Sequence, residues 1–328
     1  AKPFIPPIQN LETAQNVFSL RNIPDLDQIM STLNKNDVKN AVVVGAGFIG
    51  LEMAENLRNL GLNVTIVEKA PHVLPPLDEE MAAFVRIELE KNGVRLITSQ
   101  SATAFKNNGK IIVLEDGTEL QTDLTLLSVG VQPETTLAKE AGIELGMRGG
   151  IKVDAQYRTN FPNIYAVGDA IIVTQQITGE ETMISLASPA NRQGRQVADV
   201  IAGLCRVNQG SIGTAIVRVF DLTAASTGLS ERQAQLAGLD YAVAHSSGND
   251  HAGYFPGATN VQLKLIFHRV TGEIYGAQGI GKKGIDKRID VLATAIKGNL
   301  SVFDLPELEL TYAPPFGSAK DPVNMIGY

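Results

Sequence analysis

Short apolar runs alternate with amphipathic segments between residue 41 and about residue 100. The run AVVVG leads into a glycine-rich turn, and the helical segment FIGLEMAENLRNLG follows it and ends at Gly61, as expected of a C-terminal cap. The β-branched run NVTIVE, a second helix in LDEEMAAFVRIELEKNG and a third strand in VRLITSQ complete the order β-α-β-α-β. Strands that alternate with helices predict a parallel, doubly wound sheet with right-handed crossovers.

The pattern changes after residue 101. Short antiparallel strands are expected up to residue 126, with turns at Asn107-Asn108-Gly109 and Asp116-Gly117, and DLTLLSVG then resumes a buried strand. A buried strand at residues 164–167 and a helix at residues 188–203 predict a different α/β unit. From about Gly213, strands, a short helix in SERQAQLAG, a hairpin around Thr271-Gly272 and a final helix in GIDKRIDVLATAIKGN predict an α+β domain.

Length and composition restrict the class of protein. At roughly 100–200 residues per domain, the chain of 328 residues is long enough for about two or three domains. No apolar run reaches the ~18 residues that a membrane crossing needs, and the first residues lack the layout of a signal peptide, so a soluble protein is expected. A net charge of −7 argues against a nucleic-acid binder. The single cysteine, Cys205, excludes an intrachain disulfide and fits a reducing cytoplasm.

The first chemical motif is Gly45-x-Gly47-x-x-Gly50, between a strand and a helix. In this context the first glycine permits a tight turn, the second lets the backbone approach a pyrophosphate, and the third lets helix and strand pack closely. Glu68 ends the next strand, where it can accept hydrogen bonds from ribose hydroxyls and would repel a 2′-phosphate. The motif predicts NAD(H) binding in preference to NADP(H), although the neighbouring Lys69 opposes that preference. The alternative is a purely structural glycine turn.

The second motif is TNFPNIYAVGDA, which ends in Gly168 and Asp169. The predicted strand would place the Asp169 carboxylate at its C-terminal end, where open α/β sheets bind ligands. The alternative is an aspartate that caps the following helix.

These motifs resemble those of the two-dinucleotide flavoprotein disulfide reductases, and the resemblance extends over nearly the whole chain. GAGFIGLE is similar to their nicotinamide-nucleotide motif, SVGVQPE, which includes Gly130, to the segment that leaves that domain, and TNFPNIYAVGDA to their second flavin motif. The resemblance implies that Asp169 holds ribitol hydroxyls of FAD. It also implies that Phe48, beside Ile49, covers the flavin until nicotinamide enters, and that Glu52 meets the carboxamide. A spacing of four residues puts Phe48 and Glu52 on one helical face.

The C-terminal segments HAGYFPG and LTYAPPFGSAKDPVNMIGY are similar to those of coenzyme A-disulfide reductases and NADH-dependent persulfide reductases. The resemblance implies that Tyr254 and Tyr312 approach the active-site cysteine of the partner subunit in a homodimer. A phenol can donate a hydrogen bond to a thiolate or a leaving sulfur. The alternative for each residue is an ordinary interface tyrosine.

The first flavin motif and the redox-active cysteine of that family have no counterpart here, so the chain resembles a fragment. The expected division is a remnant of the FAD domain and a linker at residues 1–40, an NAD(H)-binding domain at 41–130, the second part of the FAD domain at 131–210, and a dimerisation domain at 211–328. Cys205 is interpreted as a packing residue. The histidines are not spaced for a metal site, and no metal is expected; they are His72, His245, His251 and His268.

The sequence therefore predicts an α/β fold of doubly wound Rossmann-type nucleotide-binding domains plus a C-terminal α+β dimerisation domain. The resemblance implies a flavoprotein that passes hydride from NADH through FAD to a cysteine-centred disulfide or persulfide, with coenzyme A as the substrate moiety. One alternative is an NADH oxidase or peroxidase of the same fold. Another is a non-catalytic NAD-binding and dimerisation module. No nucleic acid or membrane partner is expected.

Overall fold

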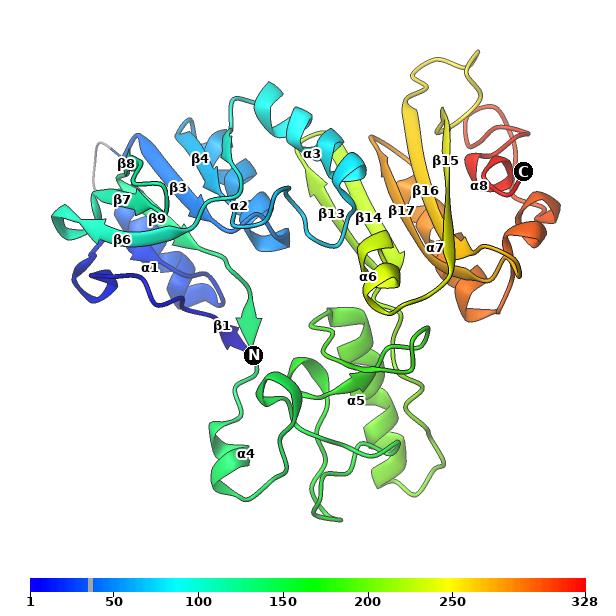
Figure 1. Ribbon diagram of the computed structural model, residues 1–328, viewed down its shortest axis with the longest axis horizontal. Helices are drawn as coiled ribbons and strands as arrows, with labels where there is room; N and C mark the ends of the chain where they lie inside the picture. The colour runs from blue at the N-terminus through cyan, green and yellow to red at the C-terminus, as the bar shows by residue number, and fades with distance from the viewer. Residues whose placement is uncertain (35–37) are drawn as a thin grey trace. The chain divides into compact units, whose positions relative to one another are not determined.

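The structure is a computed structural model that describes residues 1–34 and 38–328. It divides into two compact units (Figure 1). Unit 1 consists of residues 1–2 and 131–215, and unit 2 of residues 3–130 and 216–328. Each unit has its own hydrophobic core.

A parallel sheet of five strands organises the N-terminal half of unit 2. Its order is β2-β9-β3-β4-β5, and the strands are β2 (Val17–Phe18), β9 (Leu124–Leu127), β3 (Asn40–Val44), β4 (Asn63–Val67) and β5 (Arg95–Ile97). Helices α2 (Phe48–Asn59) and α3 (Glu79–Lys91) connect β3, β4 and β5, which confirms the predicted β-α-β-α-β order. Both helices end just before a glycine with positive φ, Gly61 (87°) and Gly93 (77°).

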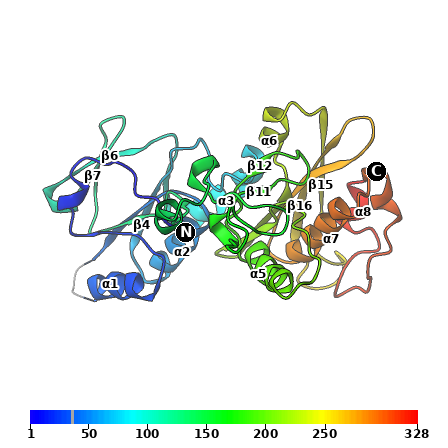
Figure 2. The same ribbon diagram turned by 90° about the horizontal axis from the view of Figure 1, so that it is seen from below.

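Helices pack on one face of this sheet, and a second sheet packs on the other. Ala41 and Val43 of β3 pack with α1 (Ile23–Leu33), α2 and α3, whereas the alternate residues Val42 and Val44 pack against a second sheet. That sheet is antiparallel and consists of β6 (Ala102–Lys106), β7 (Ile111–Leu114) and β8 (Glu119–Gln121). Figure 2 shows α1 and β6–β7 on opposite sides of the parallel sheet. The fold is thus Rossmann-like, but a small sheet takes the place of helices on one face.

Residues 3–34, which include most of the segment expected to be a remnant and linker, are built into unit 2. Strand β2 pairs with β9 at the edge of the parallel sheet, and Ile29 of α1 is 1% exposed within its core. The first strand, β1 (Lys2–Pro3), pairs with β10 (Val131–Gln132).

A second sheet of five strands organises the C-terminal part of unit 2, in the order β13-β14-β17-β16-β15. The strands are β13 (Ala215–Val219), β14 (Leu222–Gly228), β17 (Ile274–Gly281), β16 (Asn260–His268) and β15 (Tyr241–Asn249), and the last four pair antiparallel. The helices are α6 (Glu231–Leu236), α7 (Ile285–Lys297) and α8 (Pro322–Met325). This arrangement confirms the predicted α+β domain.

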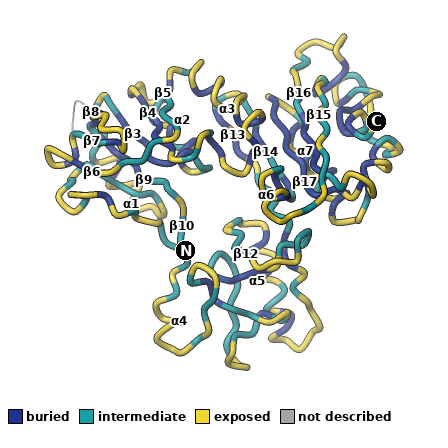
Figure 3. Tube along the Cα trace, in the orientation of Figure 1, coloured by how far each residue is buried: buried dark blue, intermediate teal, exposed yellow. Residues whose placement is uncertain are grey.

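Helices from different parts of the chain cover the two faces of strand β17. A Cβ at Gly279 would lie 3.2 Å from Ile285 and Ile289 of α7, so the absence of a side chain lets that helix approach closely. On the other face, Ile280 shares one core with residues of α2 and α3. Figure 3 shows the central strands of this sheet as buried. The N-terminal and C-terminal parts of unit 2 therefore have a common hydrophobic core.

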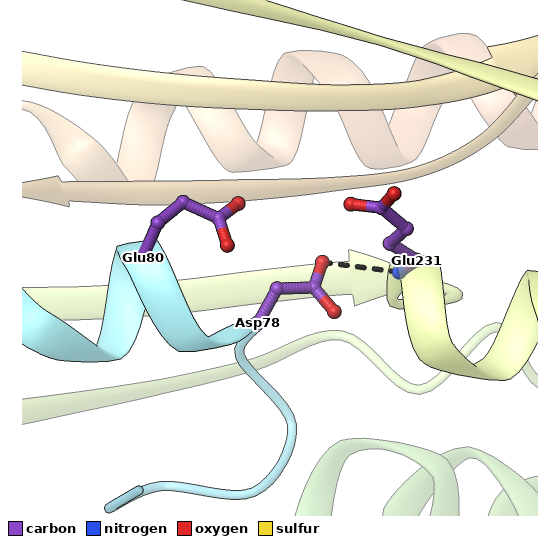
Figure 4. Close-up of side chains that lie close together, drawn as sticks. All are labelled: Asp78, Glu80 and Glu231. Atoms are coloured by element: carbon purple, nitrogen blue, oxygen red, sulfur yellow. Dashed lines mark hydrogen bonds between the residues drawn. The ribbon is translucent and has the colours of Figure 1, made fainter.

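A buried ammonium group strengthens this junction. The Nζ atom of Lys264 on β16, whose residue is 0% exposed, lies 3.0 Å from the Asp78 carboxylate before α3 and 2.7 Å from Glu231 on α6, and it also bonds Glu80 of α3. Figure 4 shows the three carboxylates converging, with Asp78 accepting a hydrogen bond from the Glu231 amide. Asp78 also exchanges two hydrogen bonds with Gln278 of β17.

Unit 1 contains α4 (Thr136–Glu140), α5 (Ala187–Ile201) and the short strands β11 (Val173–Thr174) and β12 (Glu181–Thr182). The predicted helix at residues 188–203 is confirmed by α5. The predicted buried strand at residues 164–167 is wrong: these residues are only half-buried, and they form a single bridge, between Tyr165 and Arg158. A strand needs a continuous neighbouring ladder, which this segment does not have within unit 1.

No helix among the described residues is long and apolar enough to cross a bilayer.

Replacing Lys264 with methionine should lower the free energy of unfolding by about 3–5 kcal/mol, because it leaves buried carboxylates without their cation. The matched control is Lys282→Met, which removes an exposed pair with Asp221 (3.2 Å) and should cost at most about 1 kcal/mol. Urea unfolding of both variants measures the difference. Equal costs would show that the buried cluster does not hold the two parts of unit 2 together.

Candidate functional site: a glycine-rich turn and a pair of tyrosines

The glycine-rich turn between β3 and α2 leaves no space for side chains at two positions. A Cβ at Gly45, where φ is +105°, would lie 2.5 Å from the Ser128 carbonyl oxygen, and one at Gly50 would lie 2.0 Å from that of Gly45. A Cβ at Gly47, in contrast, would meet nothing within 4 Å. Gly47 is also the N-cap of α2 and offers no capping side chain, so amide groups of the first helical turn face open space. This geometry fits a pyrophosphate.

Four hydrogen bonds stabilise this turn. The Ala46 amide donates to the Glu68 carboxylate (2.6 Å), and the Ala46 carbonyl accepts from the amide of Leu74 (2.8 Å), whose φ is +52°. The hydroxyl of Ser128 donates to the carbonyls of Val44 and Gly45, both at 3.1 Å. Neither Leu74 nor Ser128 was predicted. Leu74 lies outside every motif, and Ser128 begins the segment SVGVQPE, but its bonds to the turn depend on the packing of β9 beside β3.

Glu68 lies at the end of β4, as the sequence predicted. Its residue is 9% exposed, and its other carboxylate oxygen accepts from the Ala70 amide at 2.7 Å. The carboxylate therefore helps to fix the glycine turn, a role that sequence reasoning did not give it. Each oxygen keeps a further lone pair for a ligand hydroxyl. The ribose contact remains a prediction.

Phe48 and Glu52 lie one turn apart on α2. Phe48 is half-buried, Ile49 is 41% exposed, and Glu52 is exposed. Within the described residues, the Glu52 carboxylate has no hydrogen-bonding or ionic partner, so it is available to a ligand amide. Gly130 follows β9 with a φ of +110°, and its carbonyl accepts from the Phe4 amide (2.9 Å).

Gly168 and Asp169 form a short 3-10 turn (Gly168–Ala170). Gly168 has a φ of +82°, and its amide donates to Gln193 of α5 at 2.7 Å. The Asp169 carboxylate is half-buried and has no protein partner in the part of the chain that the structure describes. An unpaired carboxylate at this depth is suited to accept hydroxyl hydrogens, as those of a ribitol chain.

Tyr254 and Tyr312 lie together on the C-terminal part of unit 2, although 58 residues separate them. Their hydroxyl oxygens are 3.1 Å apart, and the side chains are 77% and 50% exposed. The hydrogen bond with Tyr312, followed by partial desolvation, raises the pKa of Tyr254. Since one hydroxyl donates to the other, the hydrogen of the acceptor hydroxyl is free to bind an external atom.

The remaining candidate groups have other roles. The interpretation of Cys205 as a packing residue is wrong, because the residue is exposed and lies beyond the C-terminal end of α5. His251 is 7% exposed and bonds the Asp250 carboxylate at 2.9 Å. Three carboxylates that sequence analysis did not bring together, Asp78, Glu80 and Glu231, have the spacing of a metal site, but the Lys264 ammonium group lies among them.

The parallel sheet with its glycine-rich turn is typical of Rossmann-like nucleotide-binding proteins, and an α+β part that carries the tyrosine pair follows it. Residues 1–194 match the model of the pyridine nucleotide-disulphide oxidoreductase family, and residues 214–322 match that family's dimerisation domain. The chain belongs to this family.

Several proteins of this family are similar to the chain in sequence or structure. The chain is 35% identical to a coenzyme A disulfide reductase of Staphylococcus haemolyticus (95% of this chain, 70% of the relative) and 36% identical to an NADH oxidase of Methanocaldococcus jannaschii (99% and 72%). Among solved structures, reduced Bacillus anthracis CoADR-RHD is 51% identical with a TM-score of 0.99. A NAD-dependent persulfide reductase from A. fulgidus is 40% identical with a TM-score of 0.97. The chain is covered completely in both comparisons but spans only 59% and 61% of those two structures.

Replacing Gly47 with alanine should weaken NADH binding about tenfold or more, because the new methyl group would enter the open space at the start of α2. The free energy of unfolding should change by less than about 0.5 kcal/mol, since the position has ordinary φ and no neighbours. The control is Gly194→Ala, an equally open glycine on α5. Titration of both variants with NADH measures the effect, and unchanged affinity in Gly47→Ala would contradict the assignment.

Proposed function

We propose that the protein containing this chain is an NADH-dependent flavoprotein that reduces the sulfur–sulfur bond of a coenzyme A disulfide or persulfide. The observation that carries the proposal is the exposed pair of hydroxyls on Tyr254 and Tyr312. Such a pair offers a hydrogen-bond donor to a developing thiolate at an exposed surface of this chain. The similarity to a coenzyme A disulfide reductase and to a persulfide reductase supports it.

The proposed nucleotide site consists of the glycine turn and α2. The turn at Gly45, Gly47 and Gly50 receives the pyrophosphate, Glu68 favours NADH over NADPH, and Phe48 and Glu52 orient the nicotinamide. Ile49 and Gly130 line the same site.

For the flavin, Gly168 and Asp169 are the proposed contacts. The positive φ of Gly168 lets the chain turn there, and the free carboxylate of Asp169 accepts ribitol hydroxyls. FAD, when bound, supplies the chemistry that passes the two electrons of a nicotinamide hydride to sulfur.

The overall reaction balances without a further reactant. NADH, one proton and a disulfide give NAD⁺ and two thiols: the two electrons of the hydride break the S–S bond, and the hydride together with the proton accounts for the two thiol hydrogens. The residues of this chain bind and orient the nucleotide and donate a hydrogen bond to the departing sulfur from the tyrosine pair. The cysteine that receives the sulfur is proposed to lie outside these residues, since Cys205, the single cysteine of the sequence, belongs to none of the motifs that carry the resemblance.

The proposal includes a homodimer formed through residues 211–328, which match the family's dimerisation domain over residues 214–322. A cytoplasmic location, in line with the single cysteine, also remains part of it.

An NADH oxidase is the second candidate, and the similarity to the Methanocaldococcus jannaschii enzyme favours it. A non-catalytic NAD-binding and dimerisation module is the third, for this chain taken alone. Visible absorbance of bound flavin separates the third candidate from the other two.

The acceptor assay compares coenzyme A disulfide, coenzyme A persulfide and oxygen with the full-length flavoprotein and NADH. We expect rapid NADH oxidation with a sulfur acceptor and slow oxidation with oxygen alone. Equal rates with oxygen and none with the sulfur substrates would refute the proposal in favour of an oxidase.

The double variant Tyr254→Phe/Tyr312→Phe should reduce turnover of the sulfur acceptor by about a hundredfold, because the departing thiolate loses its donor. Reduction of an artificial dye by NADH should stay unchanged, since it needs only the nucleotide and flavin sites. Tyr328→Phe is the control, because that side chain is 88% exposed and lies outside residues 250–259 and 310–321, which carry the tyrosine pair. An equal loss with the dye would mean that the tyrosines act through folding.

A further inference from the structure

Two surface segments carry the tyrosine pair. The first tyrosine loop, residues 250–259, is closed at its base, where the Asp250 amide donates to the Thr259 carbonyl (2.9 Å) and the Thr259 amide to the Asp250 carboxylate (2.5 Å). The second tyrosine loop, residues 310–321, contains no strand and only turns of its own. A single backbone hydrogen bond, from Ala252 to Pro314 (3.3 Å), links the loops besides the tyrosine hydroxyls. Such sparse links do not by themselves fix two exposed side chains to hydrogen-bonding distance.

One buried side chain forms hydrogen bonds with both loops. Arg288 of α7 is 1% exposed, and its guanidinium forms a two-point pair with Asp321 at the end of the second loop (Nε–Oδ1 3.1 Å, Nη2–Oδ2 2.7 Å). The same Nη2 donates to the carbonyl of Asp250, at the start of the first loop, at 3.0 Å. Asp321 also caps α8 by accepting from the Val323 amide (3.0 Å). Arg288 is thus a common support for the two loops.

The shape of the guanidinium is essential to this arrangement. Its Nη1 donates to the carbonyl of Gly284 at 2.8 Å. The planar guanidinium therefore donates four hydrogen bonds to three partners, which are the Asp321 carboxylate and the carbonyls of Asp250 and Gly284. The ammonium of a lysine is a single point and cannot reach all three partners. Gly284, with a φ of +69°, leaves the space that Nη1 needs, since a Cβ there would lie 2.5 Å from that atom.

We propose that Arg288 is a positioning residue for the sulfur acceptor: it holds both tyrosine loops so that the Tyr254 and Tyr312 hydroxyls stay paired, and it touches no substrate itself. This inference rests on the proposed function of the tyrosine pair and extends it to a buried residue on another element. Asp321 and the Asp250 carbonyl are the groups through which Arg288 acts.

The test is a double-mutant cycle in the full-length flavoprotein. Arg288→Lys should lower kcat for the sulfur acceptor about tenfold and leave dye reduction by NADH unchanged, because only the tyrosine geometry is disturbed. In the Tyr254→Phe/Tyr312→Phe background the same substitution should change kcat less than about twofold, since no hydroxyls remain to be positioned. An equal loss in both backgrounds would overturn the proposal, because Arg288 would then act independently of the tyrosines.

The matched control is Arg269→Lys, at the opposite end of β15 and β16 from the first tyrosine loop. Arg269 forms an exposed pair with Asp240 (3.1 Å), so this variant should behave as the parent protein. If Arg288→Lys does not fold, Gly284→Ala is the second variant. It keeps the arginine but displaces its Nη1, and it should give the same pattern of losses.

A second readout does not depend on the reaction. The pKa of Tyr254 is raised first by its hydrogen bond with Tyr312, so losing that bond should move ionisation of Tyr254 to lower pH. Ultraviolet titration, taken as the difference from a Tyr254→Phe protein, measures this shift in Arg288→Lys. If the parent protein reduces no sulfur acceptor but the shift occurs, the proposed function fails while the positioning role stands. An unshifted titration would refute that role.

Discussion

The arrangement of unit 2 depends most on the ion pairs between the buried ammonium group of Lys264 and three carboxylates. Burying a cation is costly unless anions surround it. Here three carboxylates surround the ammonium group: Asp78 just before α3, Glu80 on α3 and Glu231 on α6. Burial opposes the ionised form of Asp78, but the Glu231 amide and Lys264 outweigh it and lower the pKa of that carboxyl. The cluster thus stays charged. It fixes the first turn of α3 to the C-terminal sheet, together with the preceding segment that contains Leu74.

The Lys264 cluster connects the part of unit 2 that contains the glycine turn with the part that contains the tyrosine pair. Asp78 follows closely after Leu74, whose amide bonds the apex of the glycine turn. Lys264 belongs to β16, the strand that directly follows the first tyrosine loop. A short path of bonded residues therefore joins the proposed nucleotide turn to the proposed tyrosine site. Charged groups at such a junction specify one arrangement of the two parts, where apolar packing alone would tolerate several.

The same chemistry appears a second time on a smaller scale. Arg288 and Asp321 form a buried pair beneath the two tyrosine loops, just as Lys264 and its carboxylates lie beneath the junction with α3. In both places a buried cation on a regular element binds acidic groups from other parts of the chain. Exposed side chains that must meet across a long separation in sequence need support of this kind, because loops have few contacts of their own.

The sequence by itself determined the periodic elements and the positions where a side chain is forbidden. The β-α-β-α-β order, the helix ends at Gly61 and Gly93, and the turn at Gly45 and Gly50 follow from local rules of φ and apolar spacing. The resemblance of the motifs also identified the family. Local rules misplaced a strand at residues 164–167, because a strand depends on a neighbour that the sequence does not reveal. Only the tertiary structure decided which distant polar groups meet: Lys264 with Asp78, Arg288 with Asp321, and the Ala46 amide with Glu68. No local sequence pattern specifies these pairs, since their distances are set by the packing of whole elements.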